Sequence, residues 1–184
     1  MLTNLFDRSS GSHILKKACL GFTVFLCLLS LSSCSQLKKY DVTFNDSTLY
    51  SPQPLFSEYR IADQGLATCV EQAIEDFEVY TEAGLEVLNC SNAGISSLIG
   101  LSQFRNLKRL KLSGNDIRNL VELSVMTNLV EVQVDDNNIV DSVPLTALPS
   151  IKDVNLAHNP ALQCPGLMRF PAHVRIVFPE HCRS

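Results

Sequence analysis

The sequence lacks the motifs by which many enzymes are recognised. It contains no Gly-x-Ser-x-Gly nucleophile motif, no His-Glu-x-x-His metal motif and no glycine-rich loop that could hold a phosphate. Basic charge is also scarce, because 15 Lys and Arg stand against 19 Asp and Glu and the formal net charge is −4. Nucleic-acid-binding proteins need a basic patch. The composition therefore argues against a nucleic-acid partner, and nothing in it implies catalysis or a cofactor.

Long hydrophobic runs are absent apart from one near the N-terminus. The uncharged apolar stretch from Ala18 to Leu31 is shorter than the roughly 20 residues that a membrane-spanning helix needs. It follows the basic residues Arg8, Lys16 and Lys17, and a basic region before an apolar one is typical of a secretory signal peptide. We therefore expect residues 1–33 to be a signal peptide and the mature chain to reach an oxidising compartment.

Small residues precede a cysteine at the end of this stretch. The sequence Leu31-Ser32-Ser33-Cys34 resembles the bacterial lipobox, in which the cysteine thiol receives a diacylglycerol before cleavage. The resemblance implies that Cys34 is lipidated and anchors the chain in the cell envelope. Ser35, the second mature residue, implies the outer membrane if the source is Gram-negative. The alternative is an ordinary signal peptidase site nearby, with which small residues are also compatible.

Removal of the signal peptide would make the chain more acidic. The mature part keeps 12 basic and 18 acidic residues, which is a formal net charge of −6. A negatively charged domain is not attracted to an anionic membrane. Attachment to the membrane would then rest on the lipid of Cys34 alone.

Residues 34–62 are predicted to hold the lipidated N-terminus, a tether and a possible hairpin. Tyr40, Val42 and Phe44 alternate with polar residues, Asn45-Asp46 can form a tight turn, and residues 48–50 would return. A disordered linker is the alternative. If the hairpin forms, the free tether is residues 35–39, at most about 3.5 Å long per residue, and the domain would lie close to the membrane.

Residues 63–84 carry a helical pattern that we assign to an N-terminal cap. Apolar residues recur at spacings of three and four and predict one buried stripe, formed by Leu66, Cys69, Val70, Ala73, Ile74 and Phe77. The opposite face is polar, with Glu71, Gln72, Glu75 and Asp76. Asp63 fits the N-cap position of this helix.

A period of 22 residues runs through residues 85–164. Its most regular positions are Leu85, Leu107, Leu129 and Ile151. The intervening positions keep the same spacing, and the second unit reads Leu107, Leu110, Leu112, Asn115, Ile117, Leu120, Leu123 and Met126. The third unit leaves the pattern at Ser142 and Val143, and the first has Ala93 where an asparagine belongs.

This pattern resembles the leucine-rich-repeat family, in the short 22-residue class of the bacterial internalins. The resemblance implies an α/β solenoid in which each unit adds a short strand to a parallel sheet and neighbouring units share an apolar core. Leu110 and Leu112 would point inward from one such strand. Residues 165–184, where Val174, Ile176 and Phe178 alternate, would form a C-terminal cap with a final strand.

Asparagine recurs after each predicted strand except the first. Asn115, Asn137 and Asn159 stand where the chain of such a repeat turns inward. A carboxamide offers both donors and an acceptor, so these side chains can satisfy buried backbone groups of adjacent turns. We therefore assign this asparagine ladder a structural role.

The other face of the strands is predicted to be concave and open to a partner. Alternation places on it the candidate partner-binding residues Arg109, Lys111, Glu131, Gln133, Asp135, Asp153 and Asn155. Arg109 and Glu131 would be lateral neighbours on strands about 4.8 Å apart, so a solvated cross-strand ion pair is the alternative role for such charges. Four strands form a sheet about 15 to 20 Å wide, which suits a peptide, a loop or one face of a small domain.

Four cysteines besides Cys34 remain in the mature chain and could form disulfides. Proximity in the sequence favours Cys164 with Cys182. Cys69 faces inward from the cap helix and Cys90 occupies a core position of the first strand, so a bridge between them would join the cap to the repeats. Three pairings are possible, and two buried free thiols are the alternative for Cys69 and Cys90.

Metal-binding residues cluster only near the C-terminus. His173 and His181 accompany Cys164 and Cys182, but the short C-x-x-C or H-x-x-x-H spacing of a structural zinc site is missing. Oxidation of the cysteines would also remove the thiolates that a metal needs. We expect no metal site and no catalytic pair of cysteine and histidine.

Two classes of function then remain. The chain is either a membrane-anchored module that binds a protein or peptide in the bacterial envelope, or a structural, envelope-organising lipoprotein that contacts glycan or peptidoglycan. The predicted concave positions contain no aromatic residue, whereas sugar-binding surfaces commonly use aromatic rings as stacking platforms. We therefore favour the binding module. The fold itself does not identify the partner, since repeat scaffolds host many.

Overall fold

The computed structural model describes residues 41–164 and 170–182. The predicted signal peptide, Cys34 and the predicted tether lie outside these residues. The described chain divides into two units, with the boundary between Gln53 and Pro54. The elements are strands β1 (Val42–Phe44), β2 (Ser47–Tyr50), β3 (Val87–Asn89), β4 (Arg109–Lys111), β5 (Glu131–Gln133), β6 (Asp153–Asn155) and β7 (Arg175–Val177), with helices α2 (Gln64–Asp76) and α3 (Val143–Thr146). Short 3₁₀ helices span Glu82–Gly84, Leu101–Gln103, Val121–Val125 and Glu180–Cys182.

The first unit contains the predicted hairpin. Strands β1 and β2 pair antiparallel, with Val42 opposite Tyr50 and Phe44 opposite Ser47. Asn45 and Asp46 form the turn with φ of 48° and 62°, and positive φ at both central residues is typical of a tight two-residue hairpin turn. Every residue of the two strands is exposed, including Phe44 and Leu49.

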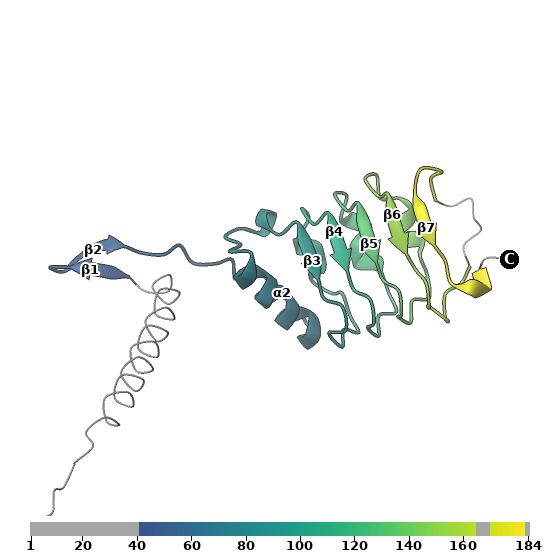
Figure 1. Cartoon of the computed structure of the whole chain (residues 1–184), viewed down its shortest axis with the longest axis horizontal. Coiled ribbons are helices and arrows are strands. Elements are labelled where there is room, and N and C mark those ends of the chain that lie inside the picture. Colours follow the sequence, from purple (N-terminus) through teal and green to yellow (C-terminus); the bar gives the residue numbers. More distant parts are fainter. Residues whose placement is uncertain (1–40, 165–169, 183–184) are drawn as a thin grey trace, which may run out of the picture. The chain divides into compact units, whose positions relative to one another are not determined.

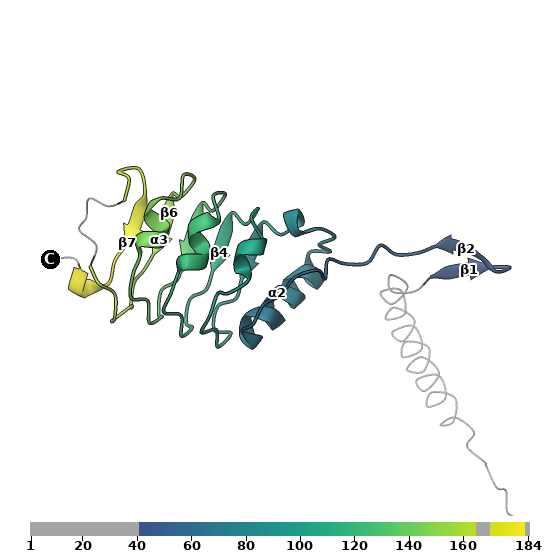
Figure 2. The ribbon, with the colours of Figure 1, turned by 180° about the vertical axis from the view of Figure 1, so that it is seen from behind.

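The second unit is a stack of repeats around a five-stranded parallel sheet in the order β3-β4-β5-β6-β7 (Figure 1). Partner residues on neighbouring strands are 22 positions apart, as Leu88, Leu110, Val132, Val154 and Ile176 are. The view from behind shows α3 and the short helical turns on the other side of the stack (Figure 2). The period seen in the sequence is therefore the step from one strand to the next.

The core lies between the sheet and these helical turns. Leu88, Leu110 and Val132 are fully buried, and the inward positions of the other repeats are buried with them. Serine stands at one such position, because Ser142 occupies the place that Leu98 and Leu120 hold in the preceding repeats. The Ser142 side chain is fully buried, and its hydroxyl has no hydrogen-bond partner among the described residues. The break seen in the sequence here is thus a polar substitution within the core.

The asparagines connect one repeat to the next. Asn137 Nδ2 donates to the backbone oxygens of Leu112 at 2.9 Å and Val134 at 3.2 Å, and its Oδ1 accepts from the amide of Ile117 at 3.0 Å. Asn115 and Asn159 make the same kind of contacts in their own repeats. Each side chain therefore satisfies backbone groups of two successive turns that could not reach water.

A second column of the repeat requires a left-handed backbone. Asn92, Gly114, Asp136 and His158 are 22 residues apart and have φ between 52° and 70°. Glycine, asparagine and aspartate tolerate this region better than most residues do. At Gly114 a Cβ atom would lie 2.2 Å from Asn92 Oδ1, so a larger residue there would require the Asn92 side chain to move.

The cap helix α2 begins and packs as the sequence predicts, except at its end. Asp63 is the N-cap, and Leu66, Val70, Ala73 and Ile74 are buried. Phe77, which we expected on the buried stripe, is 64% exposed. The α-helix ends at Asp76, and Phe77 is the C-cap with φ −98° and ψ 5°, so its side chain leaves the direction of the stripe.

The segment before Asp63 packs against the repeats, which the sequence analysis did not foresee. The rings of Phe56 and Tyr59 lie 6.1 Å and 5.6 Å from that of the buried Phe104. Gln103 Nε2 donates to the carbonyl oxygen of Arg60 at 3.0 Å. Aromatic packing and this hydrogen bond thus extend the N-terminal cap to residues upstream of α2.

Both expected disulfides are present in the structure. The Cα atoms of Cys69 and Cys90 are 5.7 Å apart, and those of Cys164 and Cys182 are 5.2 Å apart. The first joins α2 to the residue after β3, and the second joins the end of the last full repeat to the last described residue. Within the described ranges, no helix is both long and apolar enough to cross a bilayer.

Candidate functional site

The concave face is built from alternate residues of the five strands. One row holds Val87, Arg109, Glu131, Asp153 and Arg175, and the next holds Asn89, Lys111, Gln133, Asn155 and Val177, each in register with its neighbours. All these side chains are exposed or half-buried, while the residue between them on each strand is buried or, in β7, half-buried. The structure thus brings the candidate residues of strands β4, β5 and β6 together on one surface.

Acidic residues of this face are engaged with their neighbours. Glu131 Oε1 accepts from Gln133 Nε2 at 2.6 Å, and Asp135 Oδ1 accepts from the Ser113 hydroxyl at 2.7 Å. Asp153 forms an ion pair with Arg175. The carboxylates at the centre and C-terminal side of the sheet are therefore partly compensated.

The two basic residues of β4 are not compensated in this way. Among the described residues, neither Arg109 nor Lys111 takes part in an ion pair or a side-chain hydrogen bond. The lateral ion pair of Arg109 with Glu131, the alternative that the sequence left open, is absent although the two residues are in register. Two cations without an ion-pair partner among the described residues thus lie between the uncharged strand β3 and the acidic part of the sheet.

Two residues of the face were missed by the sequence analysis. Arg175 and Val177 lie on β7 beside Asp153 and Asn155. The 22-residue spacing continues from Asp153 to Arg175 and from Val154 to Ile176, so the period could have placed them. On the concave side, residues of strands β5, β6 and β7 line a polar hollow of about 280 Å³.

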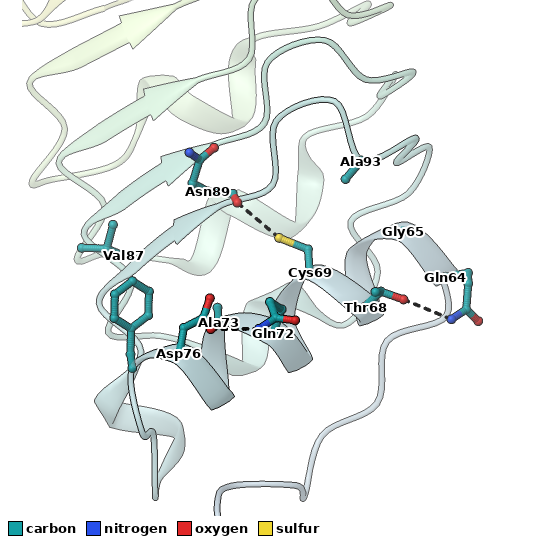
Figure 3. Close-up of a pocket in the computed structure, with 11 residues that line it drawn as sticks. Gln64, Gly65, Thr68, Cys69, Gln72, Ala73, Asp76, Val87, Asn89 and Ala93 are labelled. Atoms are coloured by element: carbon teal, nitrogen blue, oxygen red, sulfur yellow. Dashed lines mark hydrogen bonds between the residues drawn. The ribbon is translucent and has the colours of Figure 1, made fainter. Parts of the chain in front are cut away.

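A larger hollow lies at the N-terminal end of the concave face, between α2 and β3 (Figure 3). This groove has a volume of about 760 Å³. Its helix side is formed by Gln64, Gly65, Thr68, Cys69, Gln72, Ala73, Asp76 and Phe77, and its strand side by Val87, Asn89 and Ala93. The sulfur of Cys69 lies 3.3 Å from the carbonyl oxygen of Asn89, a close contact of the disulfide with the strand.

Asp63 fixes the helix that forms one wall of this groove. Its Oδ1 accepts from the amide of Leu66 at 3.1 Å, and its Oδ2 accepts from the amides of Ser96 at 2.9 Å and Ser97 at 3.1 Å. Burial alone would raise the pKa of Asp63, but these hydrogen bonds and one from the Ser96 hydroxyl outweigh it and lower the pKa. The carboxylate therefore both caps α2 and ties it to the first repeat.

The cysteines and a histidine at the C-terminal end also come together. In the described part of the chain, Cys164, His181 and Cys182 form the one group whose side chains could surround a metal ion. The two sulfurs are joined in a disulfide, and His181 Nε2 lies 3.0 Å from the carbonyl oxygen of Leu162. As long as the bridge is oxidised, its sulfurs are not thiolate ligands.

Three solved structures from Listeria monocytogenes resemble this chain. Internalin C2 is 24% identical, with a TM-score of 0.48 over 53% of this chain and 46% of that one. The functional domain of InlJ, which includes a cysteine ladder, is 26% identical, with a TM-score of 0.51 over 62% and 26%. Internalin F is 20% identical, with a TM-score of 0.36 over 55% and 42%. The chain thus spans less than half the length of each of these proteins.

No family model and no curated protein sequence matches the chain. The InlJ match and the parallel sheet agree on the architecture. The chain has an internalin-like leucine-rich-repeat fold, as its 22-residue period predicts.

Proposed function

We propose that the chain is a lipid-anchored module of the bacterial envelope that binds a protein or peptide through its concave sheet. The observation that carries the proposal is the pair of cations Arg109 and Lys111, which have no ion-pair partner among the described residues, on an open sheet whose acidic groups are partly engaged. Charges left without a partner on a concave surface are available to one. The internalin-like fold supports a protein partner, because such repeats form extended concave binding surfaces.

The chemistry of the face favours protein over glycan. The strand residues that point to the concave side, from Val87 on β3 to Val177 on β7, include no aromatic side chain. Carbohydrate surfaces commonly rely on such rings for stacking. A structural lipoprotein that contacts glycan or peptidoglycan is therefore the weaker alternative.

The binding test compares partners recovered from the envelope by affinity purification. Tagged wild type, the double variant Arg109→Glu with Lys111→Glu, and the control Arg118→Glu with Lys152→Glu would be expressed in the native host. The control makes the same charge change at exposed residues away from the concave rows. We expect the concave variant to lose proteins that the wild type and the control recover. Identical recovery by all three would overturn the concave sheet as the binding surface.

Lipid anchoring is supported by the sequence Leu31-Ser32-Ser33-Cys34 that follows the apolar stretch. Two acyl signals give stable anchoring, each buried methylene contributing about 0.8 kcal/mol. Metabolic labelling with an alkynyl fatty acid tests the assignment: we expect label on the wild type and none on Cys34→Ala. Equal labelling of both would overturn it. If lipidation holds, we propose that Ser35 directs the protein to the outer membrane in a Gram-negative host.

A further inference from the structure

The groove between α2 and β3 combines an apolar floor with polar rims. Small side chains at every fourth position of α2, namely Gly65, Cys69 and Ala73, bring the helix close to the strand. At Gly65 a Cβ atom would lie 2.3 Å from the carbonyl oxygen of Ala93, so no larger residue fits there. Phe77 and Val87 add apolar surface at the other end of the groove.

Carboxamides line both rims. Gln64 and Gln72 stand on the helix side, where their Nε2 groups donate to Thr68 Oγ1 and Asp76 Oδ1, and Asn89 stands on the strand side, where its Oδ1 accepts from Ser91. The Oε1 atoms of both glutamines and Nδ2 of Asn89 make no hydrogen bond among the described residues, so they can serve as acceptors and as a donor. These are the groups that match the N–H and C=O of an extended peptide, whereas a lipid acyl chain has nothing for them to bind. At about 760 Å³, the groove lies within the roughly 300 to 1,000 Å³ of ordinary ligand sites.

Positive charge lies directly beside the groove. Val87 and Asn89 on its strand side pair in register with Arg109 and Lys111 on β4. Neighbouring strands are about 4.8 Å apart, so both cations are within one strand of the groove. Neither cation has an ion-pair partner among the described residues, although Glu131 lies in register beside Arg109 and Asp76 lines the helix side of the groove. Both cations are therefore available to an incoming carboxylate.

We propose that this groove takes an apolar side chain of an extended peptide segment, while an acidic residue one or two positions away binds Arg109 and Lys111. The inference rests on the proposed function and names the chemistry of the partner. A segment with one apolar and one acidic residue complements this site, because the apolar hollow and the two cations are adjacent. The acidic strands β5 and β6 would repel the same segment, which favours its binding at the groove.

Selection from random seven-residue peptides displayed on phage tests the proposal on the purified full chain. We expect enriched peptides to carry Leu, Ile, Met or Phe within two positions of Asp or Glu. Synthetic versions should bind at least tenfold more weakly when the apolar residue becomes Ser or when the acid becomes its amide. Enrichment of no peptide, or of basic peptides, would overturn the proposal.

Variants of the chain locate the binding. Val87→Lys places a charged chain in the groove, and Val121→Lys makes the same change at an exposed apolar residue outside it. We expect the selected peptides to lose at least tenfold in affinity for Val87→Lys and less than twofold for Val121→Lys, with both variants melting near the wild type. Phe77→Ser, at a largely exposed residue, gives a second groove variant if Val87→Lys fails to fold. Equal binding to the groove and control variants would overturn the proposal.

Two further outcomes separate this inference from the proposed function. If Val87→Lys still recovers the envelope partner that Arg109→Glu with Lys111→Glu loses, the concave sheet stands and the groove is wrong. If saturable binding of a fluorescent fatty acid is lost in Val87→Lys while no peptide is selected, the groove is a lipid site and the peptide proposal is overturned.

Discussion

At the scale of single residues, buried polar groups hold successive turns together. The asparagine ladder does this within the repeats, but its first position holds Ala93 instead of asparagine. There the neighbour is the cap and not another repeat, and Asp63 supplies the acceptors, bonding the amides of Ser96 and Ser97. A carboxylate, and not an asparagine, therefore ties the cap to the first repeat, through amides that the ladder does not use.

This role of Asp63 predicts a pH dependence of stability. The pKa of Asp63 is lowered in the folded chain, so its contribution to stability is present above the ordinary value of 3.8 and is lost as pH falls through the lowered pKa. Asp63→Asn cannot gain or lose that charge. We expect the free energy of unfolding, measured by chemical denaturation, to fall less for Asp63→Asn than for wild type as the pH is lowered from 5 through the lowered pKa of Asp63. An equal fall for the two proteins would contradict this role of Asp63.

Adjacent residues of one strand should differ sharply in their tolerance of charge. Leu110→Asp buries a carboxylate in the core and should cost several kcal/mol, comparable with the whole stability of a small domain. Lys111→Asp, on the concave side, should cost less than about 1 kcal/mol. Thermal melting of the two variants measures the difference. Equal damage would mean that the register of β4 is wrong.

At the scale of elements, the stability of the cap should depend on its disulfide. Cys69 and Cys90 join α2 to the first repeat, and removal of such a bridge typically costs about 2 to 4 kcal/mol. In Cys69→Ala with Cys90→Ala we expect the amides of α2 to exchange hydrogen faster, because the cap can separate from the stack. Cys164→Ala with Cys182→Ala should leave exchange in α2 unchanged. Equal exchange in both variants would contradict a local role for the bridge.

The elements also show how far the sequence could predict the fold and the site. Spacings of 22 residues predict which strands pair, because each repeat buries the same inward positions against its neighbour. The packing of Phe56 and Tyr59 could not be foreseen, since it depends on Phe104, which lies far along the sequence at the end of the first repeat. Nor could the exposure of Phe77, because a periodic pattern does not report where the helix ends. The strand register places Arg109 beside Glu131, but it does not determine whether the two side chains form an ion pair.

At the scale of the whole molecule, the concave surface is divided by charge. Apolar and polar groove residues lie at one end, free cations follow on β4, and engaged carboxylates extend toward β7. An uneven distribution of this kind would orient the proposed partner along the sheet, because reversing the partner would place like charges together. Binding should therefore depend on the order of the charges as well as on their number.

The most direct test of the concave surface is a swap of charges that keeps the net charge constant. Arg109→Glu with Glu131→Arg reverses the order of charge across β4 and β5, whereas Glu86→Lys with Lys108→Glu swaps an exposed ion pair outside the two concave rows. We predict that both swapped proteins melt within a few degrees of wild type, and that only the concave swap loses the partners recovered from the envelope. Recovery of the same partners in the same amounts by the concave swap would contradict binding through this sheet.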